Sequence, residues 1–203
     1  MGLISNATVV FDAGTLNLGG SLTFIKKLTA SSSGTLTFHN GASSVVLDDT
    51  FKEYVFTFKN IHPSANGAEF LFQGNAAGGS GFDETITSTG IESFHKEDNS
   101  GTPYKAYSAY FDKAQGTSFQ SIAGNPGNGN DESSSGIMHL FNPSSTTFVK
   151  HFTTNFHTYN NNDGALQLEC AGYFNTTSAI DEIQFKMDSG NIDSGDICLY
   201  GIK

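Results

Sequence analysis

The chain has 203 residues, a length that suits one all-β domain able to bury a core without disulfide or metal cross-links. Its formal net charge of −10 and its isoelectric point of about 4.8 argue against binding to nucleic acid or to an anionic membrane surface. Two cysteines are too few for a disulfide framework, and no apolar run reaches the length of a membrane span.

The first twenty residues differ from the rest of the chain. Thr8–Phe11 could form one short strand, and glycines at positions 14, 19 and 20 interrupt the residues after it. We expect residues 1–20 to be an arm that docks the domain, with an ordinary first strand as the alternative. The segment lacks the basic and apolar regions of a secretory signal, so we expect assembly in the cytoplasm.

From residue 21 onward, apolar residues alternate with polar ones. Tyr54, Phe56 and Phe58 fall on alternate positions, and side chains two residues apart share a face only in a strand. This spacing predicts an all-β fold, a two-sheet antiparallel β-sandwich of jelly-roll type, with residues 21–203 as a single domain. The expected strands lie near residues 22–28, 35–38, 45–47, 54–61, 68–73, 85–95, 118–123, 136–141, 146–156, 165–174, 180–187 and 197–202.

The secondary structure of two segments is less clear from periodicity alone. Residues 104–111 fit either a helix face or a strand, and the surrounding glycines and β-rich neighbours favour a strand. The Asn40–Gly41 dipeptide follows the run at 35–38 and predicts a hairpin turn there.

Sites for a glycan or a protein partner are sought among exposed aromatic residues and in the most loop-like stretch, residues 124–132. The chain has no tryptophan, so the aromatic faces on which sugars stack would have to come from tyrosines, namely Tyr104, Tyr107, Tyr110, Tyr159 and Tyr173. The alternative is that these tyrosines pack their rings and expose only the hydroxyl. The candidate contact residues are Tyr104, Tyr107, Tyr110, Asn128, Asn130 and Asp131.

No catalytic constellation is recognisable. Asp83 and Glu84 are adjacent, as are Asp181 and Glu182, so in a strand each pair would point to opposite faces. Glycoside hydrolysis needs two carboxylates held across one cleft, and neither pair provides that. We therefore expect a protein that is not an enzyme and has no cofactor.

Metal binding is not expected either. The six histidines form no HxH or HExxH pair, and His139 lies in an alternating run where a solvent-side or sheet-packing position is simplest. Residues 188–196 and 128–132 carry the oxygen ligands and glycines of a calcium loop but lack its spacing. We interpret both segments as structural turns, with calcium binding as the alternative.

Both cysteines lie in apolar alternating runs. Cys170 and Cys198 are therefore predicted to be buried free thiols, and the alternative is a cross-strand disulfide.

Three stretches carry a resemblance to a known family. Residues 51–64, 136–151 and 171–203 are similar to segments that recur in virion structural proteins of marine tailed bacteriophages. Members of that family are described as concanavalin-like or lectin-like structural proteins. The resemblance implies a location on a phage particle and a β-sandwich fold, but it assigns no chemistry.

The function expected from these observations is that of a non-enzymatic virion surface protein, either a head decoration protein or a component of a tail fibre or appendage. Its partners would be other virion proteins and copies of itself in a homo-oligomer. The alternative is a glycan-binding module that mediates adsorption to the host surface.

Overall fold

The computed structural model describes the backbone of residues 3–5, 8–12, 15–16 and 21–203, and the side chains from residue 21 onward. Sixteen strands and no helix lie in this described part, so it contains no helix that could cross a membrane. The strands are β1 (Leu3–Ser5), β2 (Thr8–Asp12), β3 (Thr15–Leu16), β4 (Leu22–Ser33), β5 (Leu36–His39), β6 (Glu53–Pro63), β7 (Phe70–Ala76), β8 (Ile86–Lys96), β9 (Tyr104–Tyr107), β10 (Lys113–Gly116), β11 (Gln120–Ala123), β12 (Ser134–Phe141), β13 (Lys150–Asn160), β14 (Gly164–Phe174), β15 (Ile180–Met187) and β16 (Ile192–Ile202).

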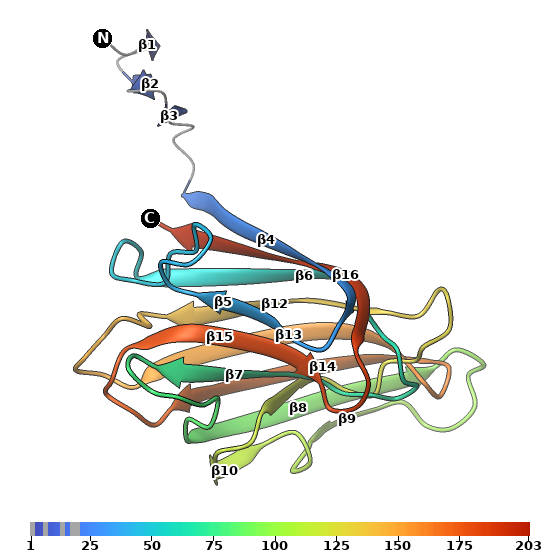
Figure 1. Ribbon diagram of the computed structural model, residues 1–203. Coiled ribbons are helices and arrows are strands. Elements are labelled where there is room, and N and C mark those ends of the chain that lie inside the picture. The colour runs from blue at the N-terminus through green and yellow to red at the C-terminus, as the bar shows by residue number, and fades with distance from the viewer. Residues whose placement is uncertain (1–2, 6–7, 13–14, 17–20) are drawn as a thin grey trace.

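Two antiparallel sheets of nine and four strands pack face to face (Figure 1). The large sheet runs β10-β8-β14-β13-β12-β6-β16-β4, with β9 also paired to β8, and the small sheet runs β11-β7-β15-β5. The predicted all-β sandwich is therefore confirmed. Strands β1, β2 and β3 form a separate three-stranded sheet. The remaining residues of the expected arm lie outside the described residues, and its docking role stays a prediction.

The alternation of aromatic residues in β6 creates the centre of the core. Tyr54, Phe56 and Phe58 point between the sheets and are at most 3% exposed, whereas Thr57 and Lys59 lie on the other face. Phe185 of the small sheet has ring contacts with five of the other core rings, most of them edge to face. The core rings are Phe38, Phe51, Tyr54, Phe56, Phe58, Phe70, Phe72, Phe152, Phe156, Phe174 and Phe185.

Glycines in the strands make room for this aromatic core. A Cβ atom on Gly136 would lie 2.6 Å from the ring of Phe156, and one on Gly172 would lie 2.7 Å from the ring of Phe152. Both are separations that real Cβ atoms essentially never show. These glycines are therefore needed for close approach of a ring, although glycine normally weakens a strand.

The sandwich has two distinct ends. Ser21 lies beside Lys203, whose amide donates to the carbonyl of Ser21 at 2.9 Å. The strand registers place the connections on the far side of β4, β6, β13 and β16 together at the opposite end (Figure 1). We call these connections the distal loops: residues 34–35, 64–69, 97–103, 124–133, 161–163 and 188–191.

The segment after β5 differs from the sequence prediction. Residues 45–47 are not a strand, although Val45 and Leu47 are buried. The Leu47 amide donates to Oδ1 of Asn40 at 2.9 Å rather than to a neighbouring strand. The predicted Asn40–Gly41 hairpin is also wrong, because the chain turns there but β5 pairs with β15, far away in the sequence.

Residues 104–111 are a strand only in their first half. Tyr104–Tyr107 forms β9 on the edge of the large sheet, as predicted. The chain then turns, with the Ser108 amide donating to the carbonyl of Gly90 at 2.9 Å. Tyr110 and Phe111 thus lie outside the strand.

The two cysteines lie on opposite faces of the large sheet and are not bonded to each other. Cys170 is buried in the core, whereas Cys198 is half-buried on the outer side beside Thr57. The prediction of free thiols is confirmed, and the disulfide alternative is wrong. Burial of Cys198 is only partial, because nothing in the described part of the chain covers that face as the small sheet covers the other.

Candidate functional site

The six residues singled out from the sequence occupy three separate places. Two of the tyrosines border one hollow, the third lies on the opposite face of the large sheet, and the three polar residues share one distal loop. The structure therefore does not assemble them into a single site. The residues are Tyr104, Tyr110, Tyr107, Asn128, Asn130 and Asp131.

Tyr104 and Tyr110 border a hollow of about 260 Å³ beside the edge of the large sheet, together with Asn125. Burial, with a smaller contribution from the Glu92 carboxylate, raises the pKa of Tyr104. Hydrogen bonding to Glu69 raises the pKa of Tyr110 to about 12. Both hydroxyls stay protonated at neutral pH, and the adjacent carboxylates make the hollow unfavourable for an anion.

Tyr107 lies on the outer face of the large sheet, the face turned away from the small sheet. It pairs with Ile91 across β8 and β9, and its hydroxyl donates to the carboxylate of Asp112. The side chain is 60% exposed. Its ring is thus accessible while its hydroxyl is held by a neighbour, which is the reverse of the alternative drawn from the sequence.

The distal loops are rich in asparagine. Asn99 and Asn125 adopt positive φ values of 58° and 46°, a conformation that asparagine tolerates better than most residues. Asn130 and Asp131 are exposed in the turn of the loop 124–133. The asparagines of these loops are Asn66, Asn99, Asn125, Asn128, Asn130, Asn161, Asn162 and Asn191.

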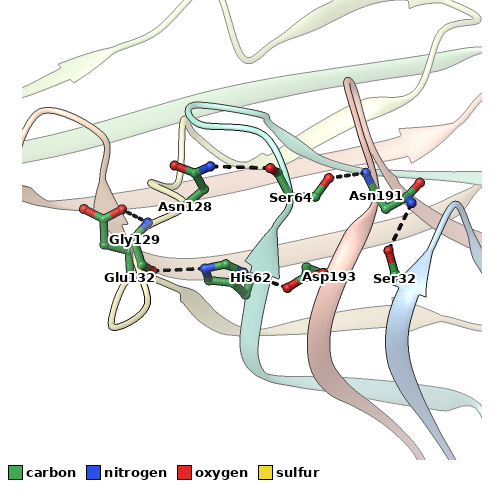
Figure 2. A network of polar contacts seen from close by, with 8 residues as sticks. All are labelled: Ser32, His62, Ser64, Asn128, Gly129, Glu132, Asn191 and Asp193. Carbon is green, nitrogen blue, oxygen red and sulfur yellow. Dashed lines mark hydrogen bonds and ion pairs between the residues drawn. The ribbon is translucent and has the colours of Figure 1, made fainter.

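Hydrogen bonds connect these loops to one another (Figure 2). The Asn191 side chain donates to Oγ of Ser32 at 3.3 Å, and its backbone amide donates to Oγ of Ser64 at 2.8 Å. Nδ2 of Asn128 in turn donates to the carbonyl of Ser64 at 3.4 Å. Three loops and the end of β4 are joined in this way, so their relative positions are fixed by polar contacts.

Backbone bonds extend the same connection across the end of the sandwich. Gly67 donates to the carbonyl of Pro126 at 2.9 Å, and Asn161 donates to the carbonyl of Asn125 at 3.0 Å. Glu97 donates to the carbonyl of Asp163 at 2.9 Å, which brings in the loop 97–103. The distal end is therefore a preorganised polar surface.

Two ionisable side chains contact the backbone of Gly129 in the loop 124–133: His62 from β6 and Glu132 from the loop itself (Figure 2). Nε2 of His62 lies 3.0 Å from the carbonyl oxygen of Gly129, and Nδ1 lies 3.7 Å from the Asp193 carboxylate. The Glu132 carboxylate accepts the backbone N–H of Gly129. A Cβ on Gly127 would collide with Oε2 of Glu132, so a larger residue there would displace the carboxylate from its present position.

A trough on the outer face of the large sheet was missed from the sequence. Three hollows of about 370, 350 and 390 Å³ follow one another along β13 and β14. Neighbouring hollows share or adjoin lining residues, so we treat them as one feature, the outer-face trough. Its central lining residues are Ile91, Ile137, Thr153, Asn155, Glu169 and Ala171. One end is lined by His151 and Tyr173, and the other by His157, Gln167, Tyr104 and Pro103 of the loop 97–103.

A small polar network lies in the middle of the trough. Nε2 of Gln167 lies 3.2 Å from Oδ1 of Asn155 and 3.2 Å from Oε1 of Glu169, and donates to both. Nζ of Lys105 lies 3.6 Å from the other carboxylate oxygen of Glu169. The sequence signal was the polar half of the alternation in 151–159 and 165–173, which is indistinguishable from an ordinary solvent-facing side.

His139 lies on this same outer face, in agreement with its predicted solvent-side position. Its ring is bonded to the Glu53 carboxylate and stacks on Phe141 with centroids 6.1 Å apart. These two contacts account for the residue without a metal.

The acidic segment 188–196 is only partly a turn. Asp188 accepts the backbone N–H of Glu69 at 3.0 Å, which is a local structural role. Asp193 and Asp196 lie within β16, where Asp196 accepts the hydroxyl of Thr29 at 2.6 Å. In the range 21–203, together with the described parts of the first twenty residues, no group of three or more His, Cys, Asp or Glu side chains could hold a metal ion.

Comparisons of the chain with protein-family models, with curated proteins and with solved structures find no match.

Proposed function

We propose that the chain is a non-enzymatic structural module on the surface of a bacteriophage particle, either a head decoration protein or a component of a tail fibre or appendage. The two-ended construction of the sandwich is the observation that best supports this function. Residue 21, which follows the N-terminal segment, and Lys203 meet at one end, while the hydrogen-bonded distal loops form the other (Figure 1). A module attached at the first end would present its distal loops away from the particle.

The construction of the domain supports the same proposal. Aromatic rings fill the interior, and hydrogen bonds tie the loops together, as suits a rigid module repeated on a particle. Free thiols fit assembly in the reducing cytoplasm of the host. The partners proposed are other virion proteins and further copies of the chain.

Purified particles provide the test. Quantitative mass spectrometry should find the chain at many copies per particle, and electron cryomicroscopy should place it on the head or tail lattice with the residue-21 end toward the particle. Absence from the particle, or only a trace of the chain, would contradict the proposal. Density with the distal loops buried against the lattice would contradict the proposed orientation.

A second candidate function is glycan binding during adsorption to the host. It is favoured by the preorganised side-chain amides and hydroxyls on the distal end and on the outer face. Purified protein should then bind host cells or their surface polysaccharide in a saturable manner. Lack of binding to cells and to isolated polysaccharide would exclude this second function while leaving the structural one untouched.

A further inference from the structure

We propose that the outer-face trough binds an uncharged linear oligosaccharide, and that Asn155, Gln167 and Glu169 are its central contacts. The inference assigns a site and a ligand class to the second candidate function and rests on it. The centre of the site lies away from the hollow of Tyr104 and Tyr110 and from the distal loops, and only its far end reaches Tyr104 and Pro103.

The shape of the trough suits a chain molecule. Along β14 the trough extends from Tyr173 to Ala165, a distance of eight residue steps or about 26 Å at the usual rise of a strand. Compact ligands normally occupy enclosed cavities that bury most of their surface. A shallow channel along two strands instead offers the same contacts repeatedly along an extended polymer.

Short side chains give the trough its depth. Ala171 and Thr153 are exposed on neighbouring strands at its centre, and Ala165 is exposed near one end. Ile91 on β8 and Ile137 on β12 rise on either side, 39% and 36% exposed. The two isoleucines make apolar walls against which the C–H faces of a sugar can pack.

The polar network at the centre presents both a donor and an acceptor. Among the side-chain hydrogen bonds of the described residues, the Asn155 side chain takes part only through Oδ1, and the residue lines the trough, so its Nδ2 donors are available to a ligand. Glu169 keeps carboxylate acceptor capacity beside it. Adjacent hydroxyls of a sugar ring can accept from the amide and donate to the carboxylate, and Gln167 holds both groups in place before binding.

Charge selects an uncharged ligand. The Glu169 carboxylate faces Lys105, and the Glu53 carboxylate faces His139, so the middle of the trough has no unopposed cation to attract an acidic polymer. The chain as a whole carries a net charge of −10, which adds long-range repulsion toward polyanions.

Aromatic residues stand at the margins of the trough. Tyr107 lies next to Ile91 on the adjacent edge strand, and Tyr173 lines one end, where its ring meets His151 at a centroid distance of 5.9 Å. Their rings supply apolar faces beside the hydrogen-bonding groups. This combination of flat apolar surface and oriented polar groups is what recognition of a neutral sugar requires.

The test uses the full chain, labelled with ¹⁵N, and a panel of linear hexasaccharides. The neutral probes are cellohexaose, laminarihexaose, maltohexaose and chitohexaose, and the charged probe is hexagalacturonate. At least one neutral probe should shift the side-chain amide signals of Asn155 and Gln167 in a saturable manner. Asn155→Ala should weaken that binding about tenfold, the effect of losing one well-placed hydrogen bond.

A matched variant separates the trough from the distal loops. Asn130→Ala removes the same amide group from an exposed loop position and should leave affinity unchanged. Ala171→Leu places a bulky aliphatic side chain on the trough floor at an exposed position and should abolish binding while the amide spectrum of the core stays native. If that substitution at Ala171 disturbs the native spectrum, Ala171→Gln is used instead, and it should likewise abolish binding while the core spectrum stays native.

The opposite results would overturn the inference. Failure of every neutral probe to bind, binding of hexagalacturonate alone, or shifts confined to the Asn128 and Asn130 amides would each refute it. Adsorption to host cells distinguishes failure of the proposed trough site from failure of the glycan-binding function. Wild-type adsorption that Asn130→Ala abolishes and Asn155→Ala preserves would retain glycan binding but move it to the distal loops.

Discussion

The two faces of the large sheet are formed by the same strands but carry different kinds of side chain, apolar on the inner face and largely polar on the outer face. On β13, Phe152 and Phe156 point into the aromatic core, while Asn155 between them points into the outer-face trough. On β14, Leu168 and Cys170 face inward, and Glu169 between them faces outward. One backbone thus supplies rigidity on one side and hydrogen-bonding groups on the other.

This difference between the faces predicts where the fold tolerates substitution. Inner-face residues interlock with rings from the opposite sheet, so truncation leaves a cavity that its neighbours cannot fill. Outer-face residues contact solvent and a few polar neighbours, so truncation should alter binding more than folding. The distal loops are intermediate, because polar contacts rather than a core hold them together.

The largest effect is expected at the centre of the core. Phe185→Ala removes a ring that contacts rings of both sheets and should lower the free energy of unfolding by about 3–5 kcal/mol. Phe148→Ala is the matched control, because that ring is 67% exposed, and it should change stability by no more than about 0.5 kcal/mol. Urea denaturation gives both values, and equal losses would refute the contrast between the buried core and the exposed surface.

The second prediction concerns Lys150, a charged residue that is buried at the end of the sandwich interior. The residue is fully buried at the start of β13, and its Nζ donates to the carbonyls of Phe148 at 2.8 Å and Thr176 at 3.1 Å. Lys150→Met leaves both carbonyls without this donor and should cost about 1–3 kcal/mol at neutral pH.

The pH dependence of Lys150 gives a second readout. Burial lowers the pKa of the lysine below its ordinary value of 10.5. Between the folded pKa and 10.5 the unfolded chain binds more protons, so stability from this group rises with pH. Wild type should gain stability relative to Lys150→Met as pH approaches 10.5, in parallel urea titrations. A constant difference between the two proteins across that range would show that the amine is not desolvated.

A smaller effect is expected in the distal loops. Gly127→Ala would displace the Glu132 carboxylate from the Gly129 amide and should cost about 1 kcal/mol, the usual value of one hydrogen bond. In a Glu132→Ala background the same substitution should cost much less, because the group in conflict is gone. A double-mutant cycle by thermal unfolding checks this, and additive losses would mean that Glu132 does not explain the glycine.

The smallest effect is expected at Glu182 on the solvent side of the small sheet. Burial opposes ionisation, but hydrogen bonds from Asn75 and His39 together outweigh it and lower the pKa of the carboxyl. The group therefore stabilises the fold above its ordinary pKa of 4.5 and loses that contribution as pH falls through the folded value.

Glu182→Gln should cost less than about 1 kcal/mol at neutral pH, as exposed ion pairs usually do. The difference from wild type should shrink as the solution is acidified below pH 4.5. Urea titrations at neutral and acidic pH measure it, and a difference that grows on acidification would reverse the assigned shift.

Local periodicity accounts for the parts of the fold that could be predicted. Tyr54, Phe56 and Phe58 share a face because a strand repeats every two residues, and this rule needs no knowledge of the partner strand. The same rule identified β8 and most other strands. It failed at Val45 and Leu47, where burial comes from packing beneath a turn rather than from strand pairing.

The candidate site was much less predictable. Tyr104, Tyr107 and Tyr110 are close in the sequence, yet the β9 pleat and the turn at Ser108 place Tyr107 on the opposite face of the large sheet from the hollow that Tyr104 and Tyr110 border. Asn155, Gln167 and Glu169 carry no recognisable motif, and only the register between β13 and β14 brings them together. Separation along the chain hides such a cluster, because each member alone looks like an ordinary solvent-facing residue.

The sequence by itself determined an all-β sandwich with an aromatic interior, since alternation and turn residues act over a few neighbours. The tertiary structure alone decided the order of the strands, the separation of Cys170 from Cys198 and the joining of the distal loops. It also decided which polar residues meet in the outer-face trough. These features depend on pairings between distant segments, and the energy that selects them appears only when the two sheets pack together.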